Sequence, residues 1–176
     1  MFYGYLCATL PDLSCGVMPE ITLAEFDALA GKVMSKSKFS ALQSWDDTET
    51  RSSVEVYRKM RDFDAFLRLR IAEKRQEKLG ITVELPENDD FYSEVDFALP
   101  AAVSSNDPLE RERIVDQIRW DRIDELECGH SLDFTTLCCY RMRLASLEKF
   151  HRRADAVGST VFAETVDRLS GSFSNV

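Results

Sequence analysis

A long stretch with helical periodicity, between about residues 49 and 79, constrains the fold more than any other feature of this chain. Its apolar residues recur at spacings of four, three and four positions: Val56, Met60, Phe63 and Leu67. These spacings place them on one face of a helix, and Gly80 is a typical residue to end it. A helix this long has to bury that face, either against other helices of its own chain or against a second chain.

Further segments carry helix start signals. Thr22 and Glu25 have the spacing of a capping box, which predicts a helix over residues 22–34. Asp107 and Pro108 suit the N-cap and first position of another helix. Helices are also predicted over residues 37–45 and 133–153, and after Ser159. We therefore predict a mainly α protein, a bundle of about five to six helices in a single domain over residues 1–176.

Two segments leave the prediction open or irregular. The apolar run at residues 3–9 and the alternating segment at 81–85 are each compatible with a small β element. Residues 81–106 contain six acids, two prolines and neither Lys nor Arg. This composition predicts an acidic irregular connection between the long helix and the next one.

The stretch DPLERERIVDQIRWDRIDEL, residues 107–126, has apolar positions all around its predicted helix. Such a helix is either contacted by several neighbours or bent near Trp120. Its many acids, Asp121 and Asp124 among them, lie within three or four positions of arginines, which favours an ion-paired face over catalytic carboxylates. Arginine also makes planar pairs with carboxylates of a partner. The candidate interaction residues are Arg111, Arg113, Arg119, Trp120 and Arg122.

The charge and the cysteines narrow the functional classes. A net charge of −9 disfavours nucleic acid as a partner, because phosphate binding needs a basic face, and it disfavours anionic lipid. No apolar run is long enough to insert into a bilayer. The five cysteines are odd in number and contain no CxxC pair, which favours reduced thiols in the cytoplasm over a disulfide framework.

The sequence contains no motif that predicts catalysis, a cofactor or a metal. Gly-rich phosphate loops, GxSxG and HExxH are missing. The segment Cys128-Gly-His130, together with Cys138 and Cys139, lacks the paired short spacings of a zinc site. The acids of the 81–106 segment lack the spacing of a calcium loop. We expect buried thiols and a protein that is not an enzyme.

Several segments resemble an uncharacterised bacterial family that is encoded among V/A-type ATPase subunits. They are FYGYLCATLPDLS with MPEITLAEFDAL, SWDDTET, ERERIVDQIRWDRIDEL, LDFTTLCCYRMRLASLEKF and GSTVFAETVDRL. The match covers most of the chain outside residues 81–100. The family's members are longer than this chain, and no binding residues of theirs carry over to it.

The resemblance implies a non-catalytic component or assembly factor of a V/A-type ATPase. The connector of these enzymes is an all-helical socket between the membrane rotor and the central stalk. A subunit-C-like connector of this kind would have other ATPase subunits as partners and would lie in the cytoplasm, peripheral to the inner membrane. The alternative is a stand-alone helical adaptor or homodimeric regulator unrelated to the ATPase.

Overall fold

Helices dominate the part of the chain that this computed structural model describes, which comprises residues 3–47, 52–81, 84 and 92–154. They are α1 (Gly4–Thr9), α2 (Leu23–Val33), α3 (Lys36–Gln43), α4 (Glu55–Leu79), α5 (Ser93–Ser104), α6 (Pro108–Glu127) and α7 (Phe134–Ala154). These ranges contain no strand. The prediction of a mainly α bundle is confirmed, and the final helix predicted after Ser159 lies outside the described residues.

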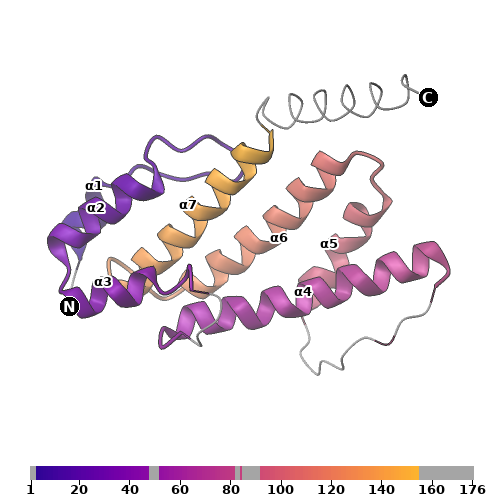
Figure 1. Cartoon of the computed structure of the whole chain (residues 1–176), viewed down its shortest axis with the longest axis horizontal. Coiled ribbons are helices and arrows are strands. Elements are labelled where there is room, and N and C mark those ends of the chain that lie inside the picture. The colour runs from indigo at the N-terminus through magenta and orange to yellow at the C-terminus, as the bar shows by residue number, and fades with distance from the viewer. Residues whose placement is uncertain (1–2, 48–51, 82–83, 85–91, 155–176) are drawn as a thin grey trace, which may run out of the picture.

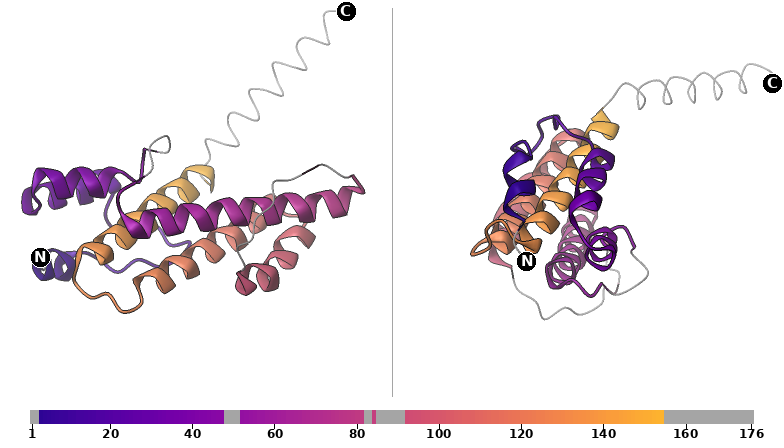
Figure 2. Two further views of the ribbon diagram at one scale, coloured as in Figure 1. Left: turned by 90° about the horizontal axis from the view of Figure 1, so that it is seen from below. Right: turned by 90° about the vertical axis from the view of Figure 1, so that its left-hand side faces the viewer.

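Helix α6 lies in the middle of the arrangement (Figure 1). It packs against α7 on one side and against α4 and α5 on the other. Helix α2 packs on α7, and α1 and α3 pack on α2. Figure 2 shows that α1, α2 and α3 gather at one end of the molecule, whereas α5 lies beside the far half of α4. A single cluster of buried apolar side chains joins all seven helices.

The apolar face predicted for the long helix is buried inside the chain. All four of its residues lie in the shared core: Val56, Met60, Phe63 and Leu67. The helix starts at Glu55, six residues later than predicted, because Ser52 bonds the backbone locally instead. Its hydroxyl accepts from the Val54 N–H at 3.1 Å, a contact that competes with helix formation.

The predicted helix ends are confirmed where local chemistry sets them. Thr22 and Glu25 form a reciprocal capping box at the start of α2. Asp107 accepts from the N–H of Leu109 at 2.9 Å ahead of α6, whose first residue is Pro108. Helix α4 ends at Gly80, which has φ +64°, a left-handed conformation that glycine adopts without a steric penalty.

The β alternative near residues 3–9 is wrong, because Gly4–Thr9 forms helix α1. A strand there would need a neighbouring strand to satisfy its backbone, whereas a helical turn satisfies much of its own. The Tyr3 N–H is bonded instead to the Leu132 carbonyl at 2.9 Å, which ties α1 to the turn before α7. Of the second β alternative at 81–85, residues 82, 83 and 85 lie outside the described residues.

The irregular connection predicted over residues 81–106 is wrong for its second half, where Ser93–Ser104 forms helix α5. Pro100 and the acids of this segment suggested a loop. However, Val95, Leu99 and Ala102 follow the i, i+4, i+7 spacing of a helix, and all three are buried. Arg70 of α4 also donates to the Asp96 carboxylate at 2.9 Å. Packing against α4 and α6 therefore outweighs the weak local preference.

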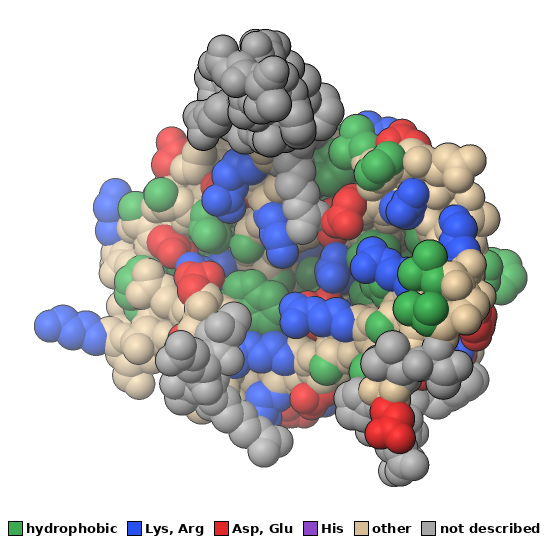
Figure 3. Space-filling view, turned by 45° about the vertical axis from the view of Figure 1, so that its right-hand side comes forward, with side chains coloured by type: hydrophobic (Ala, Val, Ile, Leu, Met, Phe, Trp, Pro, Cys, Tyr) green, Lys and Arg blue, Asp and Glu red, His purple; other side chains and the backbone are tan. Residues whose placement is uncertain are grey.

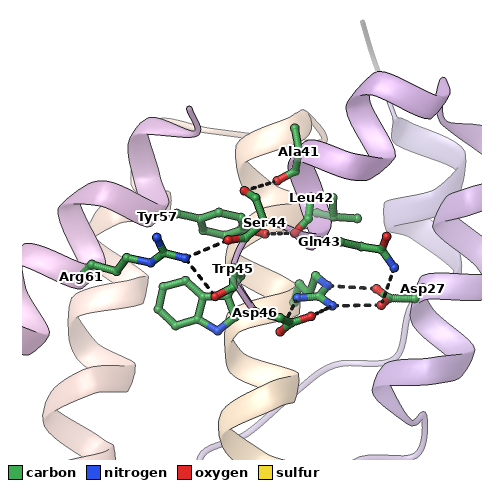
Figure 4. A network of polar contacts seen from close by, with 10 residues as sticks. Asp27, Ala41, Leu42, Gln43, Ser44, Trp45, Asp46, Tyr57 and Arg61 are labelled. Atoms are coloured by element: carbon green, nitrogen blue, oxygen red, sulfur yellow. Dashed lines mark hydrogen bonds and ion pairs between the residues drawn. The ribbon is translucent and has the colours of Figure 1, made fainter. Parts of the chain in front are cut away.

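A buried arginine ties α7 to α2 and to the segment after α3. The side chain of Arg141 is 1% exposed and bonds both oxygens of Asp27 and both oxygens of Asp46, at 2.7–3.1 Å. Figure 4 shows these two carboxylates among the contacts that hold the segment after α3, where Arg61 donates to the Ser44 and Trp45 carbonyls. Burial lowers the pKa of Arg141, but the two carboxylates outweigh it and keep the guanidinium charged.

Candidate functional site

Helix α6 is continuous and is contacted on several sides, which confirms the first of the two interpretations drawn from its sequence. Its five candidate interaction residues do not form one surface. Arg111 and Arg119 line a groove between α4, α5 and α6. Arg113 and Trp120 line a second pocket toward α7. Arg122 lies over the aromatic rings of Phe63 and Tyr92.

The first of these places, which we call the basic groove, is a cavity of about 290 Å³. Among the described residues that line it, the cations are Arg68, Arg75, Lys78, Arg111, Arg119 and Lys149, and the one acid is Glu112. Its apolar side chains are Ile71, Leu99, Ala102, Val103 and Val115. Figure 3 looks toward the end of the molecule where α4, α5 and α6 meet and shows Lys and Arg side chains around apolar ones.

Contacts at both ends hold the groove in shape. At one end, Arg119 of α6 donates to Asp64 of α4 at 2.8 Å and to Asp116 at 3.0 Å. Burial lowers the pKa of Arg119, but these carboxylates raise it by more, so the side chain remains charged. At the other end, Lys78 of α4 donates to the Val103 carbonyl of α5 at 3.0 Å. The later part of α6 thus lies beside the first half of α4, and the end of α4 lies beside the end of α5, from which the chain enters α6. Helices α4 and α6 are therefore antiparallel along the groove.

The charge of the groove is only partly neutralised within the chain. Arg68 and Arg119 share the carboxylate of Asp64. Arg111 donates to the Ser105 carbonyl at 2.9 Å, a neutral acceptor, as the Val103 carbonyl is for Lys78. The other four cations have no carboxylate partner among the described residues: Arg75, Lys78, Arg111 and Lys149. An acidic protein thus carries one local surface of strongly positive charge.

The second pocket, of about 310 Å³, lies on another side of α6. Trp120 is largely buried there, and the guanidinium of Arg143 lies 5.7 Å from its ring centre. Arg113 lies 5.9 Å from the ring centre of Phe150. These contacts pack α6 against α7. Trp120 is therefore part of the helix interface and is largely covered by its own chain.

Arg122 is held between α6 and α4. Its guanidinium lies 5.5 Å from the ring centre of Phe63 and 5.0 Å from that of Tyr92, and it donates to Glu125 at 2.6 Å. Cation–π contacts of this kind stabilise the folded chain. The predicted ion-paired face is present here and along α6, where Arg143 of α7 binds Asp124 and Glu127.

The cysteines and His130 do not come together as a reactive site within the described residues. Cys128 and His130 are exposed, and His130 contacts Asp133 at 2.7 Å. Cys138 and Cys139 are buried in the core, and burial raises the pKa of both thiols to about 12. No group of three His, Cys, Asp or Glu side chains in this part of the chain is placed to hold a metal ion.

Thiol alkylation of the native protein at pH 7.5 is expected to modify Cys128 first. Only roughly 10⁻⁴ to 10⁻⁵ of a thiol with a pKa near 12 is thiolate at this pH. Cys138 and Cys139 should therefore stay unmodified until the protein is unfolded in denaturant, whereas the half-buried Cys7 and Cys15 react slowly. Peptide mass spectrometry after timed iodoacetamide treatment measures the order. Modification of Cys138 or Cys139 at the rate of Cys128 would contradict their burial.

Sequence reasoning missed most residues of the basic groove. It selected Arg111 and Arg119 but not Arg75, Lys78 or Lys149, which come from α4 and α7. One signal was present: residues 68, 71, 75 and 78 share one face of α4 and include three of the cations. The other residues converge only when the helices pack.

Comparison with known proteins identifies no relative: no family model, no curated protein and no solved structure matches the chain. Across the described residues, each helix is too short or too polar to cross a lipid bilayer.

Proposed function

We propose that the protein is a non-catalytic component or assembly factor of a bacterial V/A-type ATPase, and that it docks another protein of that complex through the basic groove. The observation that carries a docking role is the groove itself. It gathers six cations around an apolar floor on a chain with a net charge of −9. Such a combination of charge and apolar surface is typical of a protein-binding site.

The proposal of a V/A-type ATPase in particular rests on sequence resemblance. Several segments, ERERIVDQIRWDRIDEL among them, resemble an ATPase-associated family. A helical bundle whose central helix is ion-paired and contacted on several sides is compatible with a connector, which has to keep its shape between its partners. A subunit-C-like position between the membrane rotor and the central stalk is the most specific form of this proposal. An assembly factor that leaves the finished enzyme is the other form.

The experiment that tests the proposal is a tagged purification from the native cell, followed by quantitative mass spectrometry. Recovery of the ATPase head, central-stalk or membrane-ring proteins at near-stoichiometric yield is expected for a permanent component. A strain with a tagged acidic protein of similar size provides the control for charge-driven carry-over. If an intact ATPase is present in the extract and none of its proteins is enriched, the permanent-component form is rejected.

The feature that favoured the alternative, a stand-alone adaptor, does not support it in the folded chain. Its pairing surface was the apolar face of the long helix, and Phe63 and Leu67 of that face are fully buried within the chain. A homodimer would therefore need a different surface. Light scattering of the purified protein measures its mass directly, and a dimer at micromolar concentration would restore this alternative.

A further inference from the structure

We propose that the basic groove binds an acidic amphipathic helix of a partner protein, with the partner's apolar side chains on the groove floor and its carboxylates against the rim. This inference deepens the proposed function and rests on its docking role, because it names the chemistry of the partner. It is carried by the shape, the charge and the floor of the groove.

The shape of the groove suits an elongated occupant. The α4 wall extends from Arg68 to Lys78 and the α6 wall from Arg111 to Arg119. At 1.5 Å per residue these walls are about 15 Å and about 12 Å long, which corresponds to between two and three turns of helix. A cavity of about 290 Å³ has room for apolar side chains but not for a whole helix. The partner would therefore lie on the groove with one face inserted.

The charge of the groove selects an acidic occupant. Arg75 of α4 and Lys149 of α7 are exposed, and neither binds an acid of the described chain. Lys78 and Arg111 donate to backbone carbonyls, which are neutral acceptors and carry no negative charge to offset these cations. Carboxylates on the two sides of the partner's apolar stripe would face both walls, and those spaced three or four positions apart on one side would follow one wall. Complementary charge of this kind accelerates association and excludes basic partners.

The floor of the groove selects an apolar stripe between those carboxylates. Ile71, Val103 and Val115 are aliphatic, and the groove lining includes no aromatic ring within the described part of the chain. Single-stranded nucleic acid needs aromatic platforms on which its bases stack. A free phosphate would leave the aliphatic floor uncovered. A membrane surface is repelled by the net charge of −9 and does not enter a groove between helices.

The test uses the full chain and a synthetic helical peptide of about 18 residues, long enough to span the groove walls, with a stripe of leucines flanked by glutamates and a fluorescein label. Fluorescence anisotropy in about 50 mM and about 300 mM salt measures its affinity, since exposed charge contacts weaken as salt rises. Two matched peptides are measured in parallel, one with every Glu replaced by Lys and one with every Leu replaced by Ser. Both replacements are expected to abolish binding, and the acidic peptide should bind more weakly at high salt.

The double variant Arg75→Glu, Lys149→Glu is expected to lower the affinity for the acidic peptide by at least about tenfold, because two attractive contacts become repulsive. The control Lys32→Glu, Lys36→Glu has the same change in net charge on exposed positions of α2 and α3 and should leave affinity unchanged. Val103→Thr keeps the shape of the floor but replaces a methyl group with a hydroxyl, and it should lower the affinity for the peptide severalfold. Circular dichroism verifies that each variant is folded.

Equal loss in the two charge-reversal variants would overturn the inference, since it would show an effect of net charge alone. Binding of vesicles that contain phosphatidylglycerol, without binding of the peptide, would overturn it in favour of lipid. These experiments distinguish a failure of the groove proposal from a failure of the proposed ATPase role. If the protein binds the acidic peptide but its purification recovers no ATPase proteins, the ATPase assignment is rejected and the groove proposal stands. If the Arg75→Glu, Lys149→Glu variant still recovers ATPase proteins at the normal yield, the groove proposal is rejected and the ATPase assignment stands.

Discussion

Replacement of Arg141 with methionine is expected to lower the free energy of unfolding by about 3 kcal/mol. This is the typical cost of removing one partner of a buried ion pair, because the other partner keeps an uncompensated charge. The guanidinium bonds Asp27 of α2 and Asp46 beyond α3. Without it, the two carboxylates would repel each other and Asp27 would lose its main partner. Urea denaturation at neutral pH, followed by far-ultraviolet circular dichroism, measures the change.

Two control variants separate the buried arrangement from a simple loss of charge. Arg68→Met removes an arginine that is also paired with a carboxylate, Asp64, but whose side chain is 73% exposed. Its cost should stay below about 0.5 kcal/mol, as for exposed ion pairs in general. Asp46→Asn removes the more exposed of the two acids and should cost less than Arg141→Met. If Arg68→Met were as destabilising as Arg141→Met, burial would not be the cause.

Replacement of Phe63 with alanine is expected to lower the free energy of unfolding by about 3–5 kcal/mol, as for large aromatic side chains removed from a core. Phe63 is fully buried, and its ring meets the edge of Tyr92 with 5.0 Å between ring centres. The substitution would open a cavity where α4, α6 and the start of α5 meet, and would also remove one ring beneath Arg122. Equilibrium denaturation measures the loss.

Phe97 provides a matched control for this substitution. It lies on α5 and is 91% exposed, so Phe97→Ala should change stability by less than about 0.5 kcal/mol. Phe63→Leu is a second control, because it keeps most of the apolar volume and should cost less than Phe63→Ala. Equal effects of Phe63→Ala and Phe97→Ala would show that the packing around α4 is not that of the folded protein in solution.

The arginines of α6 illustrate how differently similar residues act in one helix. Arg122 stacks on core rings, Arg119 closes one end of the groove, and Arg111 lies along the groove wall. Mutation of Arg119 would therefore change stability and partner binding together, whereas mutation of Arg122 would change stability. Arg75 and Lys149 are cleaner probes of docking, because neither has an ion pair among the described residues that its removal would break.

The sequence by itself determined the parts of the fold that depend on neighbours along the chain. The capping box of Thr22 and Glu25, the Asp107-Pro108 start of α6 and the Gly80 end of α4 all follow from the order of the residues. Each depends on backbone angles and hydrogen bonds within about four residues, so the residue types are sufficient to specify it. The apolar face of α4 was predictable for the same reason, since helical spacing alone defines it.

Only the tertiary structure decided which surfaces those helices share. Helix α5 forms despite Pro100 because Val95 and Leu99 are buried against its neighbours, which local preference does not report. The basic groove joins residues 68–78 of α4 to Lys149 of α7, far apart in sequence. Core packing sets how each helix is rotated and paired, and it depends on all the side chains at once. The place where cations meet an apolar floor is therefore a property of the packed bundle and not of any one segment.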